Sequence, residues 1–450
     1  MIIENIKTAI LWILILTSVG LTWEIWTYTP AYNELEESGE GYVEIEAIGD
    51  SRSLLDVLYP NEVLVHNEEQ IYLIHPTKEN YEELDDLLES VNIEFINPVA
   101  EPSSRAPSLD RFYNGIEIVF DQAIKGDWLN QLFTVEEENI PIEYVNRIIF
   151  MENNYGDEVR LQFVDTENEE IYESARSISK TDLEAFYNDT ENDRASVEKK
   201  VFQQKDNSEF QPVRYVVTEP MTLRKFTYES QDLSVQAFSQ ILFPEPEFVR
   251  RIPQGRQGET FTDGKRMMTI QESGSILKFE RPDSGGQQTP MLEDGLEFIN
   301  SHSGWTGDYY AERWRESSAT GEATFRLHVG GFPVLGSNMN DDQLYTIHVS
   351  RADSNQITEY TRPMFKLGEN PFEIESNVRL QPFDVLEQHI FENEIFDMDS
   401  VEDIKIGHNM IRERSFATFE PAWYVKVRGR WTQVDISSEL SQGGIENGLE

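Results

Sequence analysis

The sequence lacks cysteine altogether and is poor in basic residues. Without cysteine, the chain of 450 residues cannot form disulfides, thiolate zinc sites or cysteine nucleophiles. Its 37 Lys and Arg residues face 83 Asp and Glu residues, which leaves a formal net charge of −46. Because nucleic acids and anionic membrane surfaces are bound mainly through Lys and Arg, this balance argues against both as partners. An acidic, solvated surface of this kind suits salty or alkaline surroundings.

The sequence also lacks the short motifs of common enzymes and metal sites. It contains no H-E-x-x-H, G-x-S-x-G, P-loop or G-x-G-x-x-G pattern. His328 and His348 fall in predicted strands and can be neighbours across a sheet, either as a metal-binding pair or as hydrogen-bonded sheet residues. The acidic segments 338–343 and 397–403 lack the glycine turn of an EF-hand loop and suggest solvated turns. We therefore expect no catalytic residues, no metal, no cofactor and no enzymatic activity.

One long uncharged run stands out at residues 8–23, TAILWILILTSVGLTW. As a helix this run spans about 24 Å, and extension through Tyr28 gives the length that a hydrocarbon layer of about 30 Å requires. Pro30 then ends the helix. Three amphipathic aromatics suit the membrane interface: Trp23, Trp26 and Tyr28. We predict that residues 1–30 form a cytoplasmic start and a single transmembrane helix that anchors the chain in membrane lipid.

The charges on either side of this run predict its orientation in the cell membrane. Lys7 precedes the run and Glu34, Glu36 and Glu37 follow it, and basic residues favour the cytoplasmic side. The N-terminus is therefore expected in the cytoplasm and about 420 residues outside. A cleavable signal peptide is the alternative, with the small residues 18–20 as a weak cleavage site. We favour an uncleaved anchor, because aromatic residues and an acid follow that site at once.

The predicted span has two different faces. At 100° per residue, five residues fall within roughly 80° of arc and form a small, partly polar face that suits contact with another helix. They are Ile10, Ile13, Thr17, Gly20 and Glu24. Trp12, Trp23 and Trp26 lie on the opposite, bulky side. The alternative is that threonine and glycine merely occur often in spans and that Glu24 reaches to water.

Outside the span, hydrophobic periodicity predicts an α+β fold in three domains. Their expected limits are 42–195, 201–288 and 289–440, with the polar segment 188–210 as the first boundary. Apolar residues at helical spacing predict helices at 51–60, 78–91, 181–188, 233–243, 291–301 and 385–396. Strands are predicted at 116–120, 147–152, 159–165, 213–220, 221–230 and 422–436, with 213–220 and 221–230 as a pair.

Two segments of the chain resemble each other. TIQESGSILKFERP and TIHVSRADSNQITEYTRP share Thr-Ile, a polar turn and the pattern I-x-x-[FY]-x-R-P. Their final prolines, Pro282 and Pro363, are 81 residues apart. Two hairpins of similar composition can arise by chance, but the match predicts that the middle and last domains have related folds.

Both ends of the chain resemble one protein family. The pattern L-T-W-x-[LI]-W-x-Y-x-P-x-Y follows the basic start, and the tail FEPAWYVKVRGRWTQVD (419–435) looks like a P-x-W-Y-V ending. The first pattern is matched by Leu21, Thr22, Trp23, Ile25, Trp26, Tyr28, Pro30 and Tyr32. Together with the predicted single span, these features resemble the YycH family, also called WalH. The interior agrees with that family mainly in length and organisation.

The resemblance implies regulation rather than catalysis. YycH proteins regulate the sensor histidine kinase WalK (YycG) of the WalK/WalR system, which controls cell-wall metabolism in low-GC Gram-positive bacteria. They act with a related single-span protein, YycI, and their transmembrane helices contact the kinase. The family fold has three extracytoplasmic domains, the later ones related to each other and to YycI. Regulation restrains the kinase in some relatives and activates it in others, and the strongly acidic surface departs from typical members.

Two other readings of the sequence stay open. An anchored cell-envelope binding module would hold a wall-derived ligand or a protein in an aromatic groove, for which SGWTGDYYAERW (303–314) is the candidate unless it is a buried loop. An anchored hydrolase is the third reading, and no motif in the sequence supports it.

Overall fold

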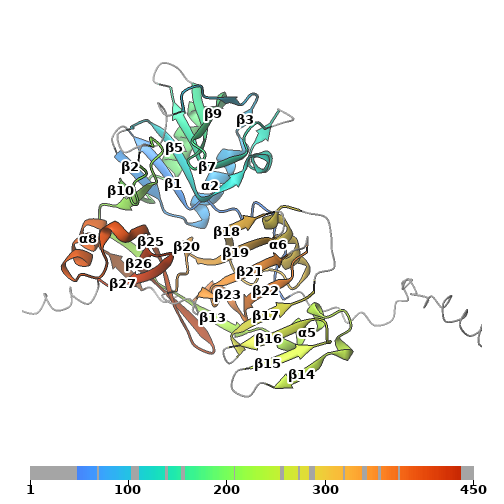
Figure 1. Cartoon of the computed structure of the whole chain (residues 1–450). Coiled ribbons are helices and arrows are strands. Elements are labelled where there is room, and N and C mark those ends of the chain that lie inside the picture. The colour runs from blue at the N-terminus through green and yellow to red at the C-terminus, as the bar shows by residue number, and fades with distance from the viewer. Residues whose placement is uncertain are drawn as a thin grey trace, which may run out of the picture. The chain divides into compact units, whose positions relative to one another are not determined.

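The computed structural model describes residues 48–436, apart from 68–69, 103–110, 137–139, 154–157, 207, 254–257, 272–273, 283–288, 318–319, 337–341, 353–355 and 373–375. The chain divides into two compact units, 1–46 and 47–450. The first unit lies outside the described residues, so the fold described below is that of the second. It is a strand-rich mixture of α-helices and β-sheets (Figure 1).

The first sheet has nine antiparallel strands in the order β11-β10-β2-β1-β5-β7-β8-β9-β4. In chain order the strands are β1 (Glu62–Asn67), β2 (Gln70–Ile74), β4 (Asn97–Pro98), β5 (Gly115–Lys125), β7 (Tyr144–Glu152), β8 (Glu158–Asp165), β9 (Glu170–Ser179), β10 (Arg194–Val201) and β11 (Val213–Val217). The strands predicted at 116–120, 147–152 and 159–165 are confirmed as β5, β7 and β8. The segment 188–210 contains β10, which pairs with both β2 and β11.

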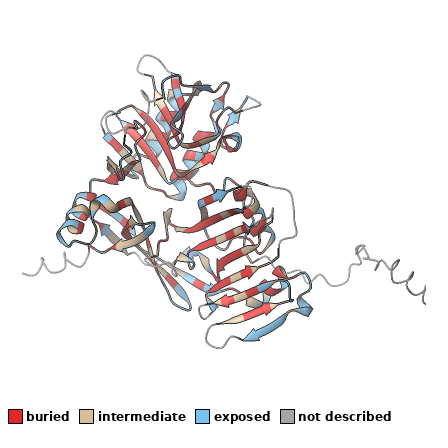
Figure 2. Cartoon of the chain, in the orientation of Figure 1, coloured by how far each residue is buried: buried red, intermediate tan, exposed pale blue. Residues whose placement is uncertain are grey.

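Both faces of the first sheet are buried at its centre (Figure 2). Side chains alternate between the faces of a strand, so Ile116 and Ile118 of β5 lie on one face and Glu117 on the other. The isoleucine face shares a core with helices α2 (Lys78–Glu89) and α4 (Lys180–Asp189). Both helices were predicted, and α4 begins with a capping box between Ser179 and Asp182.

The helix predicted at 51–60 is wrong. Residues 54–57 form only a turn, in which the Leu58 amide donates to the Leu54 carbonyl. Asp56 accepts hydrogen bonds from both the backbone N–H and the hydroxyl of Ser53, and the Asp56 backbone N–H donates to Ser53 Oγ, which is the capping-box pattern of a helix start. Pro60 prevents this first turn from continuing as a helix. The apolar spacing reflects burial of the turn, because Leu54 and Leu58 both enter the core.

The second sheet has nine strands, eight of them in the order β14-β15-β16-β17-β22-β21-β19-β18, with β20 pairing beside β19. The strands are β14 (Arg250–Pro253), β15 (Glu259–Thr262), β16 (Met267–Gln271), β17 (Ile276–Glu280), β18 (Tyr309–Glu316), β19 (Thr320–Val329), β20 (Phe332–Pro333), β21 (Thr346–Ala352) and β22 (Glu359–Pro363). Helices α5 (Val235–Leu242) and α6 (Met291–Ser301), both predicted, precede its two halves.

The two halves of this sheet repeat one pattern, a helix followed by four strands of the path: α5-β14-β15-β16-β17 and α6-β18-β19-β21-β22. The last strands of the halves pair with each other, and Phe279 lies opposite Tyr360, the residue at the same place in the repeated sequence. The halves are therefore related by a local two-fold axis at this pair. The arginine of each half packs against the helix of the other half. Arg281 lies 5.2 Å from the ring of Phe298 in α6, and Arg362 lies 5.2 Å from the ring of Phe238 in α5.

The third sheet has the order β23-β13-β26-β25, with β27 pairing beside β26, and a separate ladder joins β12 and β24. The strands are β12 (Met221–Arg224), β13 (Phe226–Asp232), β23 (Phe365–Pro371), β24 (Asn377–Leu380), β25 (Val401–Arg412), β26 (Phe416–Val427) and β27 (Arg430–Val434), and helix α8 spans Phe383–Glu392. The predicted strands 213–220 and 221–230 exist, but their predicted pairing is wrong. They share a hydrophobic cluster, in which Val216 and Met221 are buried, without forming a ladder.

Short elements complete the described fold. They are the parallel pair β3 (Asn92–Ile93) and β6 (Thr134–Val135), helix α3 (Leu129–Leu132), and the 3-10 turns η2 (Gly126–Trp128), η3 (Pro246–Phe248) and η6 (Met398–Ser400). The three-domain limits set out above stay a prediction.

Candidate functional site

The predicted partner-binding face and interface aromatics lie outside the described residues. This applies to Ile10, Ile13, Thr17, Gly20, Trp23, Glu24, Trp26 and Tyr28. None of the helices that the structure describes combines the length and the hydrophobicity of a membrane span. The role of that face therefore stays a prediction.

The two strand histidines do not form a pair. Strands β19 and β21 are neighbours, but His348 lies opposite Thr324, whose hydroxyl is 3.1 Å from the His348 Nδ1 atom. His328 packs instead against Tyr310, with ring centroids 5.0 Å apart, and burial lowers the pKa of its imidazole to about 4. Within the described ranges, no three His, Asp or Glu side chains are grouped closely enough to hold a metal ion.

The aromatic stretch 303–314 forms a loop and the start of β18, and its last residues, 312–314, line a cleft described below. Trp305 and Tyr309 are almost fully buried, and the Trp305 N–H of the backbone donates to the Asp50 carbonyl. The indole N–H of Trp305 donates to Asn300 at 2.8 Å. The loop therefore packs the second sheet against the start of the described chain, and Trp305 and Tyr309 are used in the core.

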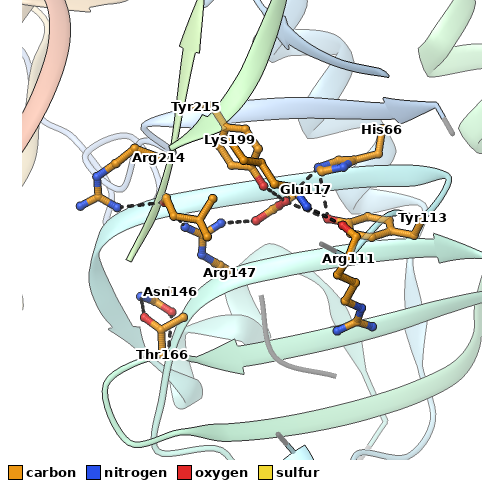
Figure 3. Close-up of polar contacts among 11 residues, drawn as sticks. His66, Arg111, Tyr113, Glu117, Asn146, Arg147, Thr166, Lys199, Arg214 and Tyr215 are labelled. Carbon is orange, nitrogen blue, oxygen red and sulfur yellow. Dashed lines mark hydrogen bonds and ion pairs between the residues drawn. The ribbon is translucent and has the colours of Figure 1, made fainter. Parts of the chain in front are cut away.

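A buried carboxylate lies on the other face of the first sheet, at Glu117 of β5. Four side chains converge on it, as Figure 3 shows: Arg147, His66, Tyr113 and Tyr215. The hydroxyls of Tyr215 and Tyr113 donate to Glu117 Oε2 at 2.6 and 2.8 Å, and His66 Nε2 lies 2.9 Å from the same oxygen. Arg147 pairs with Glu117 Oε1 and donates to the Val213 carbonyl at 2.7 Å. We call these five residues the Glu117 cluster.

The Glu117 cluster is electrostatically closed. Burial alone would raise the pKa of Glu117, but the Arg147 guanidinium and the hydrogen bonds from His66 and Tyr215 hold it well below its usual range. Burial, and then the neighbouring carboxylate, raise the pKa of both tyrosines, so they remain hydrogen-bond donors. The cavity beside the cluster has a volume of about 10 Å³, too little for a ligand. The arrangement therefore fixes β1, β5, β7 and β11 together and offers nothing for chemistry.

A larger cleft lies where strands of all three sheets meet, and its volume is about 950 Å³. The first sheet contributes residues 121–123 of β5, where this strand leaves its register with β7. Between the pairs Val119–Arg147 and Ile124–Val145, four residues of β5 face a single residue of β7. Such bulges redirect side chains and are frequent beside functional sites. We call this cleft the charged cleft.

More than half of the residues that line the charged cleft carry a charged side chain. Seven of its 22 lining residues are basic: Lys125, Arg214, Arg313, Arg315, Arg326, Lys405 and Lys426. Seven are acidic: Asp121, Asp165, Glu167, Glu312, Glu316, Asp342 and Asp403. The lining is thus formally neutral in a chain whose net charge is −46.

Most of the basic residues in the cleft are held by carboxylates of the lining. The pairs are Lys405 with Asp121, Arg214 with Asp403 at 3.0 Å, Arg326 with Glu312 at 2.7 Å and Asp342 at 2.8 Å, and Lys125 with Glu316 at 3.6 Å. Burial would lower the pKa of Arg326, but its two carboxylate partners raise it. Burial would raise the pKa of Asp121, but Lys405 and Arg214 lower it. The pairs of Lys405 and Arg214 join the first sheet to the third, and that of Lys125 joins the first sheet to the second.

Two lining cations have no such partner. Among the described residues, no carboxylate lies within ion-pairing distance of Arg315 or Lys426. Arg313 has only a marginal contact with Glu322 at 4.0 Å. The Lys426 ammonium lies 5.6 Å from the centre of the Trp431 ring, and the Lys405 ammonium lies 5.7 Å from the same ring. The cleft can therefore hold an anion beside an aromatic surface, but it presents no nucleophile with an adjacent base.

A smaller cavity of about 80 Å³ is lined by residues of all three sheets, among them Glu62, Phe332 and Trp423. The Oε2 atom of Glu62 is buried and has no hydrogen-bond partner among the residues that the structure describes. Burial raises the pKa of Glu62 to about 7, although Arg214 opposes the shift. This carboxyl is therefore neutral in the folded protein at mildly acidic pH.

Sequence reasoning did not find the charged cleft. Its lining comes from nine strands and several turns that are far apart in the chain, so no local motif marks it. One signal was available: in a chain so poor in basic residues, Lys426, Arg428 and Arg430 fall within five positions, and Arg313 and Arg315 flank Trp314.

Comparisons with known proteins cover nearly the whole chain. A sequence model described as the YycH protein, N-terminal domain, matches residues 4–195, and one described as the YycH protein, C-terminal domain, matches residues 211–440. The chain is 20% identical over 464 residues to the two-component system WalR/WalK regulatory protein YycH of Bacillus subtilis (strain 168), covering 99% of each chain. It is also similar to the crystal structure of YycH from Bacillus subtilis, with a TM-score of 0.69, 17% identity, and coverage of 86% of this chain and 98% of that one. The last match shows a shared fold.

Proposed function

The chain belongs to the YycH family, and on that premise we propose that it regulates a WalR/WalK two-component system. The observation that carries this proposal is the similarity over 99% of both chains to a protein named for that regulation. Because the match runs from end to end, it includes the predicted span as well as the three sheets.

The proposed mechanism is modulation of the WalK (YycG) sensor kinase together with YycI, in the control of cell-wall metabolism. The chain is placed in the cell membrane by one span, with its N-terminus in the cytoplasm and the three sheets outside. A protein of this kind changes kinase activity only if it binds one signalling state of the kinase better than the other. Contacts of the span and of the extracytoplasmic sheets are both available for that purpose.

The small face of the span is the proposed contact with the kinase or with YycI. Thr17 and Gly20 allow a second helix to approach closely, and hydroxyl and backbone groups then form contacts that lipid cannot replace. Glu24 lies at the outer end of this face, where interfacial water limits the cost of its charge. The opposite face, with Trp12, is bulky and suits lipid.

A pair of span variants tests this assignment. We expect Gly20→Leu in the full chain to reduce co-purification of the host's sensor kinase and of the YycI-type protein, because the larger side chain separates the helices. Trp12→Leu on the opposite face is the matched control and should leave co-purification unchanged. Equal recovery of both partners with the two variants would show that the small face is not the contact. Recovery of neither partner with the unaltered chain would contradict the regulatory proposal itself.

A further inference from the structure

The charged cleft differs in composition from the chain around it. Acidic residues outnumber basic ones by 83 to 37 in the whole sequence, whereas the cleft lining has seven of each. Over the chain as a whole, a residue therefore has many more acidic than basic side chains around it on average. The cleft has collected basic residues from all three sheets, and this requires a physical reason.

Ion pairing between the sheets explains only part of this collection. Lys405 with Asp121 and Arg214 with Asp403 each connect the first sheet to the third. A purely structural junction would use every cation in this way, because carboxylates are plentiful. Arg315 and Lys426 line the same cleft without a carboxylate partner among the described residues. Lys426 helps to lower the pKa of Asp121 from a distance, but neither cation makes a direct ion pair with a described carboxylate, so both can still contact a ligand.

The surroundings of Arg315 and Lys426 are suited to binding a ligand. Arg315 is exposed and Lys426 half-buried, so both are accessible, and Arg313 lies on the same strand with only its marginal contact to Glu322. Trp431 adds an aromatic surface beside Lys426. At physiological ionic strength the repulsion from the distant acidic surface is screened beyond about 8 Å, so the local charges decide what binds.

We propose that the charged cleft is a binding site for a ligand with more than one phosphate or carboxylate group. Arg313 and Arg315 supply guanidinium groups that can bind such groups in a bidentate manner, and Lys426 supplies a compact charge. The cleft, at about 950 Å³, is of the size that holds a small molecule or one segment of a polymer. The paired cations, such as Arg326, keep the walls in place.

This inference is independent of kinase regulation, so the two proposals fail separately. A cleft that binds anions would stand even if no kinase co-purified, and a regulator could act through its span with an empty cleft. If both hold, the cleft offers the extracytoplasmic part a ligand to sense. That would combine the regulator with the envelope-binding module considered from the sequence.

Titration calorimetry on the full chain in a neutral detergent tests the site, with pyrophosphate and citrate as probes at low salt. We expect saturable binding that weakens as salt is added. The double variant Arg315→Gln/Lys426→Gln should bind about tenfold more weakly, because two charged contacts are lost. The matched control is Arg250→Gln/Arg414→Gln, which removes two exposed charges outside the cleft and should bind as the unaltered chain does. Tighter binding of pyrophosphate would indicate phosphate as the natural group, and tighter binding of citrate would indicate carboxylate.

A fluorescence signature locates the bound probe. Movement of the Lys426 ammonium toward the anion should change the emission of Trp431, and Trp431→Phe should lose that change while still binding the probe. Equal affinity of the two double variants, no saturable binding of either probe, or an unaltered emission change in Trp431→Phe would each overturn the proposal. Near-ultraviolet circular dichroism of every variant confirms that the comparison is made between folded proteins.

Discussion

The Glu117 cluster and the charged cleft both depend on strand β5, yet they use charge in opposite ways. At Glu117 one carboxylate receives Arg147, two tyrosine hydroxyls and a histidine, and the space beside it is about 10 Å³. Four residues further along the strand, Asp121 lines a cleft of about 950 Å³. There the lining includes cations that form no ion pair with a carboxylate of the described ranges.

The difference teaches how to separate structural from functional charge in an acidic protein. A buried ion pair whose hydrogen bonds are all made is costly to break, because removal of one partner leaves the other buried and unpaired. An accessible cation without a partner contributes little to stability and is available to a ligand. The same substitution type should therefore give large stability effects in the Glu117 cluster and small ones in the cleft. The predictions below test this contrast, from the largest effect to the smallest.

The largest loss is expected from Glu117→Ala. Arg147 and two tyrosine hydroxyls then remain buried without their acceptor, and we expect a loss of about 3–5 kcal/mol in the free energy of unfolding. Chemical denaturation of the full chain, followed by tryptophan emission, measures it. The double variant Glu117→Leu/Arg147→Met removes both charges and should recover part of the loss. A loss in Glu117→Ala no larger than that of an exposed glutamate would break the contrast.

Substitution of Glu62 should increase the free energy of unfolding, by an amount that depends on pH. Burial raises its folded-state pKa to about 7 from 4.5, so the stability that the neutral carboxyl contributes is present below 4.5 and is lost as pH rises through about 7. Glu62→Gln keeps the neutral shape at all pH values. It should therefore be more stable than the unaltered chain at about pH 8, by up to about 3 kcal/mol, and the gain should shrink toward mildly acidic pH. A gain that is constant with pH would show that Glu62 does not titrate in this range.

An intermediate loss is expected from removal of single hydroxyls in the Glu117 cluster. Tyr215→Phe removes a donor 2.6 Å from Glu117 Oε2 and should cost about 2 kcal/mol in unfolding free energy, as expected for a hydrogen bond to a buried charge. Tyr113→Phe should cost less, because Tyr113 is partly accessible and water can replace its hydroxyl. Thermal unfolding of the two variants side by side gives the order. The reverse order would mean that the cluster is open on the Tyr215 side.

The smallest stability effect is expected in the cleft. Arg315→Gln and Lys426→Gln should each change the free energy of unfolding by less than about 0.5 kcal/mol, because neither side chain forms an ion pair within the described part of the chain. The same denaturation measurement applies, with Lys405→Gln as the contrasting variant, since it leaves Asp121 unpaired. A loss of several kcal/mol at Arg315 would mean that this cation is structural, and the contrast between the two regions would then disappear.

The sequence predicted much of the local structure, since α2, α4, α5, α6 and α8 lie where apolar spacing placed helices. The repeat ending at Pro282 and Pro363 predicted two related folds, and the structure adds what it could not: the repeats pair with each other, with Phe279 opposite Tyr360. The error at 51–60 arose because a buried turn and a short helix have the same apolar spacing. The wrong pairing of 213–220 with 221–230 arose because local pattern carries no information on partner strands.

Local sequence pattern could not predict the Glu117 cluster or the charged cleft for the same reason. Glu117 sits in the apolar run IEIVF, where a single acid in a strand suggests an exposed face, and its cation Arg147 is 30 residues away. The cleft is assembled by a bulge in β5 and by hairpins from three sheets. The predicted contact face of the span, by contrast, rests on helix periodicity alone and lies outside the described residues.

Regulation of a sensor kinase by this protein should be visible in the kinase's own phosphorylation. The host kinase would be reconstituted in vesicles with the YycI-type protein and either the full chain or a version whose residues 8–28 are a neutral polyleucine span. We expect the native chain to change the rate of autophosphorylation and the polyleucine version to change it less or not at all. An unchanged rate with the native chain would contradict regulation, and an equal change with both versions would move the regulatory contact from the span to the extracytoplasmic sheets.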